Sequence, residues 1–295
     1  MKIELLADIV IGLQYGDEGK GKVASAIAET RLYTQTARYN GGPNAGHTVN
    51  LDNGKQLKLH QIPVSVIHKV PGHIGAGCAV NFSMLEQEAR DFRKVMGFCP
   101  YEYLSISPRA VLIGSGHVKR DQQEQAITQG STGSGIAPAY ASFYDRSARL
   151  ANCYTWPDKN GRECIQELHN CKDLLLEGAQ GFYLDPHLGN YPYTTSSSSH
   201  PGYAAATMGF PTNIIDEIFG VAKCYETRSG EDPNFYKVLT EDGFITPEFS
   251  EVTNRQIDKI YTDIQEVGSE IGVTTGRQRK VRFLDVNRLI KAINS

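Results

Sequence analysis

The sequence predicts an α/β fold with a mostly parallel central sheet flanked by helices. Short apolar runs of strand length alternate along the chain with longer stretches that have helical spacing. Two of the apolar runs lead directly into glycine-rich turns, and in open parallel sheets the loops beyond the strand ends carry the functional site. No linker composition divides the chain, so we expect residues 1–295 to form a single domain.

The predicted elements begin with a strand at 8–13, which is rich in Ile, Val and Leu. A glycine-rich turn and a helix over 22–31 follow it. A Ser-x-x-Glu spacing then predicts a capped helix over 83–92. A second short strand is expected at 174–176, again ending on a glycine-rich turn. Helical spacing predicts three later helices, at 214–219, 256–264 and 286–293.

Composition argues against several classes of protein. A formal net charge of −3 does not fit a broad basic face for nucleic acid, and no apolar run has the length of a membrane span. The apolar N-terminus carries acidic residues and no cleavage site, which favours a buried strand over a signal peptide. The six cysteines form no CxxC pair, so we expect reduced thiols in a cytoplasmic protein. Cys164, His169 and Cys171 are close in sequence, but without a second ligand pair they do not predict a zinc site.

The first glycine-rich turn, at 12–22, reads Gly-Leu-Gln-Tyr-Gly-Asp-Glu-Gly-Lys-Gly-Lys. Backbone N–H groups of closely spaced glycines and a helix N-terminus favour bound phosphate, and Lys20 adds a point charge. The turn is not a strict Walker A motif, which would have glycine at position 14 and Ser or Thr at 21. Asp17 repels phosphate unless it holds Mg²⁺ or acts on a substrate. From the residues alone, a phosphate loop and an ordinary tight turn both remain open.

Five segments, in the same order along the chain, resemble the adenylosuccinate synthetase family. They are the turn at 12–22, Asn-Gly-Gly-Pro-Asn-Ala-Gly-His-Thr at 40–48, Gly-Ser-Thr-Gly-Ser-Gly-Ile-Ala-Pro-Ala-Tyr at 130–140, Glu-Gly-Ala-Gln-Gly at 177–181 running on to 191–197, and Thr-Thr-Gly-Arg-Gln-Arg at 274–279. The resemblance implies that family's fold, which is similar to that of P-loop NTPases. It also implies a ligase that joins L-aspartate to C6 of a 6-oxopurine nucleotide through a 6-phosphoryl intermediate. Mg²⁺ and a nucleoside triphosphate are then required.

The resemblance also implies catalytic roles. Asp17 is expected to be the base and a Mg²⁺ ligand, and His47 the acid at O6 of the purine. Lys20 is expected to hold the transferring phosphoryl group, and Gln180 belongs to the same catalytic set. The Gly46 carbonyl is expected to be a further Mg²⁺ ligand.

Other residues are implied to bind substrates. The triphosphate is expected to contact Gly16, Gly19, Lys20, Gly21, Lys22, Thr48 and Arg279. The purine nucleotide is expected to contact Asn44, Ser131, Thr132, Gln180, Leu184, Thr195 and Ser229. The aspartate loop is expected to bind through Thr274, Thr275, Arg277 and Arg279. Arg146 is expected to reach the substrate phosphate of a neighbouring subunit, which implies a homodimer.

The chemistry explains why these residue types are needed. The 6-oxygen of the purine belongs to a cyclic amide, and phosphorylation turns it into a leaving group. Asp17 suits removal of the N1 proton, while Mg²⁺, Lys20 and loop N–H groups neutralise the transferring group. Guanidinium groups bind carboxylates bidentately, which suits Arg277 and Arg279. Singly, His47, Arg146 and these arginines are typical of ordinary surface or loop residues, and only the joint pattern predicts a site. His60, His68 and His187 are expected to be structural.

Two departures from the family bear on the substrates. The sequence ends at Ser295 without the family's Asn/Thr-Lys-x-Asp segment that reads guanine, so we expect either a shortened chain or a donor of the ATP or dATP type. Ser229 stands where the family places valine beside the ribose. A short chain without the guanine-reading end resembles the phage branch, which uses dGMP to make the precursor of 2-aminoadenine, although Asp17 is kept where some phage members have serine. The favoured hypothesis is dGMP with ATP or dATP, in the host cytoplasm. IMP with GTP is the alternative, and a non-catalytic nucleotide-binding switch or an inactive paralogue is more remote.

Overall fold

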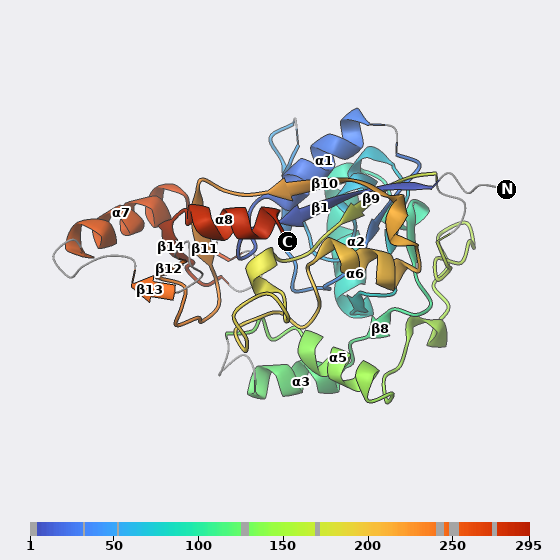
Figure 1. Cartoon of the computed structure of the whole chain (residues 1–295). Helices are drawn as coiled ribbons and strands as arrows, with labels where there is room; N and C mark the ends of the chain where they lie inside the picture. Colours follow the sequence, from blue (N-terminus) through green and yellow to red (C-terminus); the bar gives the residue numbers. More distant parts are fainter. Residues whose placement is uncertain are drawn as a thin grey trace.

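The computed structural model describes residues 5–31, 33–51, 53–124, 130–168, 172–239, 245–247, 254–272 and 276–295. Its centre is a six-stranded sheet in the order β10-β1-β9-β2-β5-β7, in which every neighbouring pair is parallel (Figure 1). The strands are β10 (Ile215–Val221), β1 (Leu6–Gly12), β9 (Asp173–Glu177), β2 (Gln35–Arg38), β5 (Gly72–Ile74) and β7 (Leu104–Ile106). The predicted fold class is therefore confirmed.

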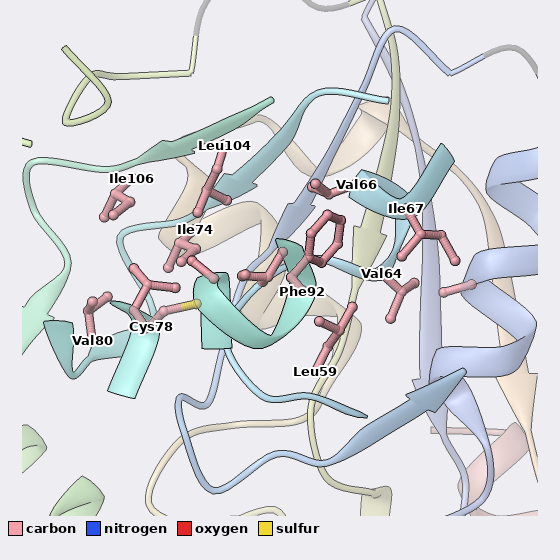
Figure 2. Close-up of a cluster of buried hydrophobic side chains, with 14 of the residues drawn as sticks. Leu59, Val64, Val66, Ile67, Ile74, Cys78, Val80, Phe92, Leu104 and Ile106 are labelled. Carbon is pink, nitrogen blue, oxygen red and sulfur yellow. The ribbon is translucent and has the colours of Figure 1, made fainter. Parts of the chain in front are cut away.

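The central strands are apolar on both faces because helices cover both faces of the sheet. In β1, Val10 packs into one buried cluster, while Ile9 and Ile11 pack into another. The first cluster includes side chains of α1 (Lys20–Thr30) and α2 (Phe82–Met96), and Figure 2 shows the ring of Phe92 among its aliphatic neighbours. The second cluster includes side chains of α6 (Pro201–Met208) and α8 (Val286–Ile293).

Smaller elements surround the carboxyl edge of the sheet. A hairpin pairs β3 (His47–Asn50) with β4 (Gln56–Leu59), and β6 (Ala79–Val80) pairs in parallel with β8 (Val111–Leu112). Helices α3 (Ser115–Gln123) and α5 (Ile136–Tyr144) lie together below the sheet in the view of Figure 1. The described 3₁₀ helices are η1 (Val64–His68), η2 (Pro100–Glu102), η3 (Ala151–Cys153), η4 (Phe182–Leu184) and η5 (Thr212–Ile214).

Elements that follow β10 form a lobe beside the sheet, at the left of Figure 1. It pairs β11 (Tyr225–Arg228) with β14 (Lys280–Phe283) and β12 (Lys237–Leu239) with β13 (Ile245–Pro247), both antiparallel, and carries α7 (Asn254–Val267). Arg288 of α8 ties this lobe to the front of the chain, since its guanidinium hydrogen-bonds to the hydroxyl of Tyr15 and to the carbonyl of Lys237, the latter at 2.7 Å. The single-domain prediction stays a prediction.

Most predicted elements are found close to their expected bounds. The strands at 8–13 and 174–176 correspond to β1 and β9, and the helices at 256–264 and 286–293 to α7 and α8. The helix at 83–92 is present, but Asn81 caps it by accepting from the Met84 N–H at 3.2 Å. No described helix combines the length and apolar character needed to cross a bilayer.

The helix predicted at 214–219 is wrong, because this segment forms strand β10. Isoleucines at 214, 215 and 218 with the phenylalanine at 219 mimic helical spacing. The segment instead pairs with β1 along its length, with Ile9 opposite Ile218 and Val10 opposite Phe219. Tertiary pairing overrides a local pattern in such cases.

Candidate active site

A cavity of about 870 Å³ opens where the carboxyl ends of β1, β9 and β2 meet the surrounding loops. This volume is in the upper part of the range of small-molecule sites. Seventeen of the residues predicted from the sequence line it: Gly16, Asp17, Gly19, Lys20, Gly21, Lys22, Asn44, Gly46, His47, Thr48, Ser131, Thr132, Gln180, Leu184, Thr195, Ser229 and Arg279. The fold thus brings four of the five sequence segments to one place, together with Arg279 from the fifth.

The glycine loop between β1 and α1 is organised from inside by Glu18, which sequence reasoning missed. One carboxylate oxygen of Glu18 accepts from the N–H groups of Gln14 at 3.1 Å and Gly16 at 2.8 Å. The other lies 2.6 Å from Nζ of buried Lys20. A Cβ at Gly12 would lie 2.4 Å from Oε2 of this carboxylate, so a larger residue there would displace the Glu18 side chain from these partners. The loop is therefore held in its curved shape without a ligand.

Asp17 lies at the tip of this loop with its backbone in the left-handed region, at φ 61°. Its Oδ2 is 2.9 Å from Nε of Arg279 and 3.4 Å from the hydroxyl of Ser229, which donates to it. Three predicted residues from distant parts of the chain therefore meet at one carboxylate.

Arg279 is held in turn by Glu270, a second carboxylate that sequence reasoning missed. Nη1 of Arg279 lies 2.6 Å from Oε2 of Glu270, and the other oxygen of Glu270 accepts from the Tyr225 hydroxyl at 2.5 Å and from Lys223 at 3.3 Å. Burial alone would raise the pKa of Glu270, but these hydrogen bonds and the adjacent cations hold that pKa below its usual range.

His47 begins β3 and is buried beside the end of β9. Its Nδ1 hydrogen-bonds to Oε1 of Glu177, whose other oxygen accepts from the Val64 N–H at 3.0 Å. Burial lowers the pKa of His47, and the nearby carboxylate opposes that shift. Gly21 of α1 packs against the ring side, because a Cβ there would lie 2.7 Å from Cβ of His47.

The glycine-rich segment at 130–135 is fastened to α3 by Asp121. This carboxylate is almost completely buried and accepts from the Ser131 hydroxyl at 2.6 Å and from the Gly135 N–H at 2.7 Å. The hydroxyls of Thr132 and Ser134 hydrogen-bond to each other at 2.8 Å. Asp121 is a site residue that no local sequence pattern indicated.

Two buried amide oxygens of cavity-lining residues have no hydrogen-bond donor among the described residues. Oδ1 of Asn44 and Oε1 of Gln180 make no hydrogen bond within the described part of the chain. Buried polar atoms in native proteins almost always have a partner, so this pair indicates a ligand that donates hydrogen bonds here. Asn40 fixes the backbone around them, donating to the Ser198 carbonyl at 2.9 Å and accepting from the Ala179 N–H at 2.7 Å.

Some predicted residues do not line the cavity. Arg277 donates to the Gly130 carbonyl at 2.9 Å, at the edge of the glycine-rich segment. Arg146 follows α5 and is not part of the wall of its own chain. Thr274 and Thr275 lie outside the described residues. His60 and His68, expected to be structural, hydrogen-bond to the Ala45 carbonyl and the Ser25 hydroxyl.

The donor atoms of the site fit Mg²⁺. The Asp17 carboxylate and the segment containing the Gly46 carbonyl both border the cavity, and Mg²⁺ in nucleotide sites takes one or two carboxylates together with phosphate oxygens. The described residues contain no group of three His, Cys, Asp or Glu side chains placed to hold a metal. Of the sequence cluster considered for zinc, Cys164 is buried, whereas His169 and Cys171 lie outside the described residues.

A glycine loop at the end of a parallel strand, an acid at its tip and a large polar cavity define a nucleotide-dependent enzyme class. The family model described as adenylosuccinate synthetase matches residues 9–163 and 159–295. The chain belongs to the adenylosuccinate synthetase family, and it is a C–N-forming ligase of that type.

Relatives with this name come from several organisms. The chain is 34% identical to adenylosuccinate synthetase of Pseudomonas syringae pv. syringae over 340 residues, covering 97% of this chain and 73% of the relative. It is 32% identical to the enzyme of Wolinella succinogenes over 331 residues, covering 95% and 73%.

Two solved structures share the fold. Fully ligated adenylosuccinate synthetase from Plasmodium falciparum matches with a TM-score of 0.78 at 24% identity, covering 97% of this chain and 73% of that one. Succinoaminodeoxyadenylate synthetase of cyanophage S-2L, bound to dGMP and dATP, matches with a TM-score of 0.72 at 17% identity, covering 98% and 81%. At these identities the likeness shows the fold alone.

Proposed function

We propose that this ligase joins L-aspartate to C6 of dGMP, with ATP or dATP as phosphoryl donor, and forms N6-succino-2-amino-2′-deoxyadenylate. The observation that carries the choice of nucleotide is the pair of unpartnered acceptors, Oδ1 of Asn44 and Oε1 of Gln180. Because N1–H is the proton that Asp17 is proposed to remove, the donor left for these acceptors is the 2-amino group, which has two N–H bonds in guanine and is missing in hypoxanthine. A purine with a 2-amino group therefore fits the two acceptors better than hypoxanthine does.

The fold comparison supports the same proposal. The cyanophage S-2L protein holds dGMP and dATP on this fold. Ser229 adds a hydroxyl beside Asp17, and this is the position where the family's valine would present only methyl groups near the ribose. A serine there gives the site a polar contact that differs from the usual arrangement.

IMP with GTP is the second candidate, and the relatives favour it. Proteins 30–34% identical to this chain carry the name adenylosuccinate synthetase. Asp17 is also retained, which fits the ordinary reaction as well as the proposed one. Under either candidate the side chains around the cavity have the same roles.

In the proposed mechanism Asp17 removes the N1 proton as O6 attacks the γ-phosphorus, and the bond from that phosphorus to the β-phosphate oxygen breaks. Asp17 and the Gly46 carbonyl would hold Mg²⁺, which would supply charge neutralisation for the transferring group. Lys20 and the glycine loop line the cavity and would bind the phosphates. His47 donates to O6. The amine of aspartate then attacks C6, and phosphate leaves.

Aspartate is proposed to bind at the loop 274–279, through Arg277 and Arg279. Nη1 of Arg279 hydrogen-bonds to Glu270, whereas Nε lies 2.9 Å from Oδ2 of Asp17 without a hydrogen bond to any described residue, so a buried N–H donor is left for a substrate carboxylate. Arg146 is proposed to serve a neighbouring subunit of a homodimer. Light scattering of the purified chain tests this assignment, with a particle of twice the 32.5 kDa chain mass as the expected result.

The test of function is phosphate release with aspartate and Mg²⁺ while IMP, GMP and dGMP are crossed against GTP, ATP and dATP. Aspartate-dependent release with dGMP and an adenine triphosphate is expected. Turnover of IMP with GTP and none with dGMP would overturn the choice of substrate and leave the family reaction in place. Triphosphate cleavage that ignores aspartate would favour the non-catalytic switch.

A further inference from the structure

Glu177 is the last residue of β9 and lies next to the reaction site without lining the cavity. Its carboxylate is buried to 2% exposure, and the His47 side chain beside it is exposed by 6%. A buried carboxylate is costly unless its oxygens are paired. The partners of Glu177 therefore indicate what the residue does.

Each oxygen of Glu177 has a defined partner. Oε1 hydrogen-bonds to Nδ1 of His47 and lies 3.7 Å from Nη1 of buried Arg38, while Oε2 accepts from the Val64 N–H at 3.0 Å. Arg38 ends β2, the strand that pairs with β9 beside it, with Arg38 directly opposite Glu177. The carboxylate thus has a fixed position, set by two neighbouring strands and η1.

This position has a consequence for the imidazole ring. A carboxylate paired with a guanidinium is ionised and only accepts hydrogen bonds, so Nδ1 of His47 must carry a proton and donate it to Glu177. The ring lines the cavity and its Nδ1 edge is occupied, which leaves Nε2 for the substrate. Gly21 lies close behind His47, since a Cβ at Gly21 would be 2.7 Å from Cβ and 3.1 Å from Cγ of the histidine.

We propose that Glu177 is a positioning residue for the ligase reaction: it fixes the His47 ring with Nδ1–H toward its own carboxylate and Nε2 toward O6 of the purine. The expected effect of Glu177 on kcat rests on the proposed role of His47 as the acid at O6. The orientation of the His47 ring does not depend on that role.

A purely structural role makes a different prediction. Glu177 could serve only to neutralise Arg38 and hold β9 to β2, and its loss would then affect stability and every activity equally. Glu88 of α2 provides the matched control. It is also a buried carboxylate and accepts from the N–H groups of His60, Gln61 and Ile62 at 2.8–3.0 Å, but it has no contact with His47.

The kinetic test is a double-mutant cycle of Glu177→Gln and His47→Ala, with Glu88→Gln as control. Glu177→Gln is expected to lower kcat about 10- to 100-fold, as loss of a residue that orients a site imidazole does, with little change in KM. In the His47→Ala background the same change should cost less than about twofold, because the residue through which it acts is gone. Glu88→Gln should leave kcat within about twofold in both backgrounds. Equal losses from Glu177→Gln in the two backgrounds would overturn the proposal.

The spectroscopic test needs no substrate, and its main readout is made on the wild-type protein. In ¹⁵N-labelled wild-type protein the His47 ring signals are assigned by their loss in His47→Ala. They should show a proton on Nδ1, shifted by Glu177→Gln and unchanged by Glu88→Gln. A neutral His47 ring with a bare Nδ1 would refute the inference. A wild-type protein with this ring signature but no aspartate-dependent turnover would refute the proposed function and leave the orientation standing.

Discussion

Nε of Arg279 lies 2.9 Å from Oδ2 of Asp17, so the side chain proposed to bind the substrate carboxylate is paired with the side chain proposed to be the base. On these proposed roles, arriving aspartate would compete with Asp17 for the same guanidinium. Binding of the amino-acid substrate and exposure of the base would then be coupled through one arginine. Glu270 keeps that arginine in place during the exchange, since it contacts a different nitrogen, Nη1.

Asp17→Asn should lower kcat at least about 10²-fold, because the amide can neither accept the N1 proton nor neutralise Mg²⁺. Asparagine is the suitable replacement, since the backbone at this position has φ 61° and asparagine tolerates the left-handed region better than alanine. The partly exposed ion pair with Arg279 contributes no more than about 1 kcal/mol, so the thermal midpoint should change little. Phosphate release and calorimetry check both statements, and normal turnover would remove Asp17 from the mechanism.

Arg277→Leu should raise KM for aspartate about 10- to 100-fold, the effect of removing one or two charge-assisted hydrogen bonds to a carboxylate. Its contact with the Gly130 carbonyl makes a smaller rise in KM for the purine nucleotide expected as well. Initial rates measured against each substrate in turn distinguish the two effects. Arg109→Leu is the control, since Arg109 forms an exposed ion pair with Glu167 and does not line the cavity. An unchanged KM for aspartate in Arg277→Leu would show that this residue does not bind it.

Asp121→Asn should destabilise the fold by about 1–3 kcal/mol and raise KM for the purine nucleotide. The amide can keep its oxygen toward the Gly135 N–H only with its nitrogen toward the Ser131 hydroxyl, which must then accept instead of donate. Both charge-assisted hydrogen bonds of the carboxylate are thereby lost, at a cost of that size. Chemical denaturation and nucleotide titration provide the two readouts. Asp145→Asn is the control, because its carboxylate is exposed and accepts from the Ser147 N–H. Wild-type stability and nucleotide KM in Asp121→Asn would contradict the fastening role.

Four of the described cysteines should fall into two classes toward a thiol-alkylating reagent at pH 8. Burial raises the pKa of Cys78 to about 12 and that of Cys164 to about 11, so both stay protonated and shielded. Cys153 and Cys224 are exposed and should be alkylated in the native protein. Mass spectrometry after a short pulse of reagent reads out each site. Labelling of Cys78 or Cys164 before unfolding would show that the sheet core opens.

The N-terminal segment of β1, glycine turn and α1 was predictable because the sequence patterns that indicate it are local. The apolar run of β1, the glycine turn and α1 follow one another within 25 residues, and the residues of the turn line the cavity. The carboxylates that hold the site in shape were not predictable. Glu270 meets Tyr225 across 45 positions, and Glu177 meets His47 across 130, and spacing patterns do not report contacts of this range. A glutamate closing an apolar strand was the available signal for Glu177, and Asp121 on a polar helix had none.

The bond between Arg288 and Tyr15 joins positions 273 residues apart. A ribosome adding roughly 5–20 residues per second needs on the order of half a minute to span that separation. During synthesis the Tyr15 hydroxyl therefore lacks its Arg288 partner for about that time, even if β1 and α1 have already packed together. The nascent protein therefore passes through a stage in which the loop lacks its distal brace, and a nucleotide present in the cell at that stage meets a loop that is not yet fully fastened.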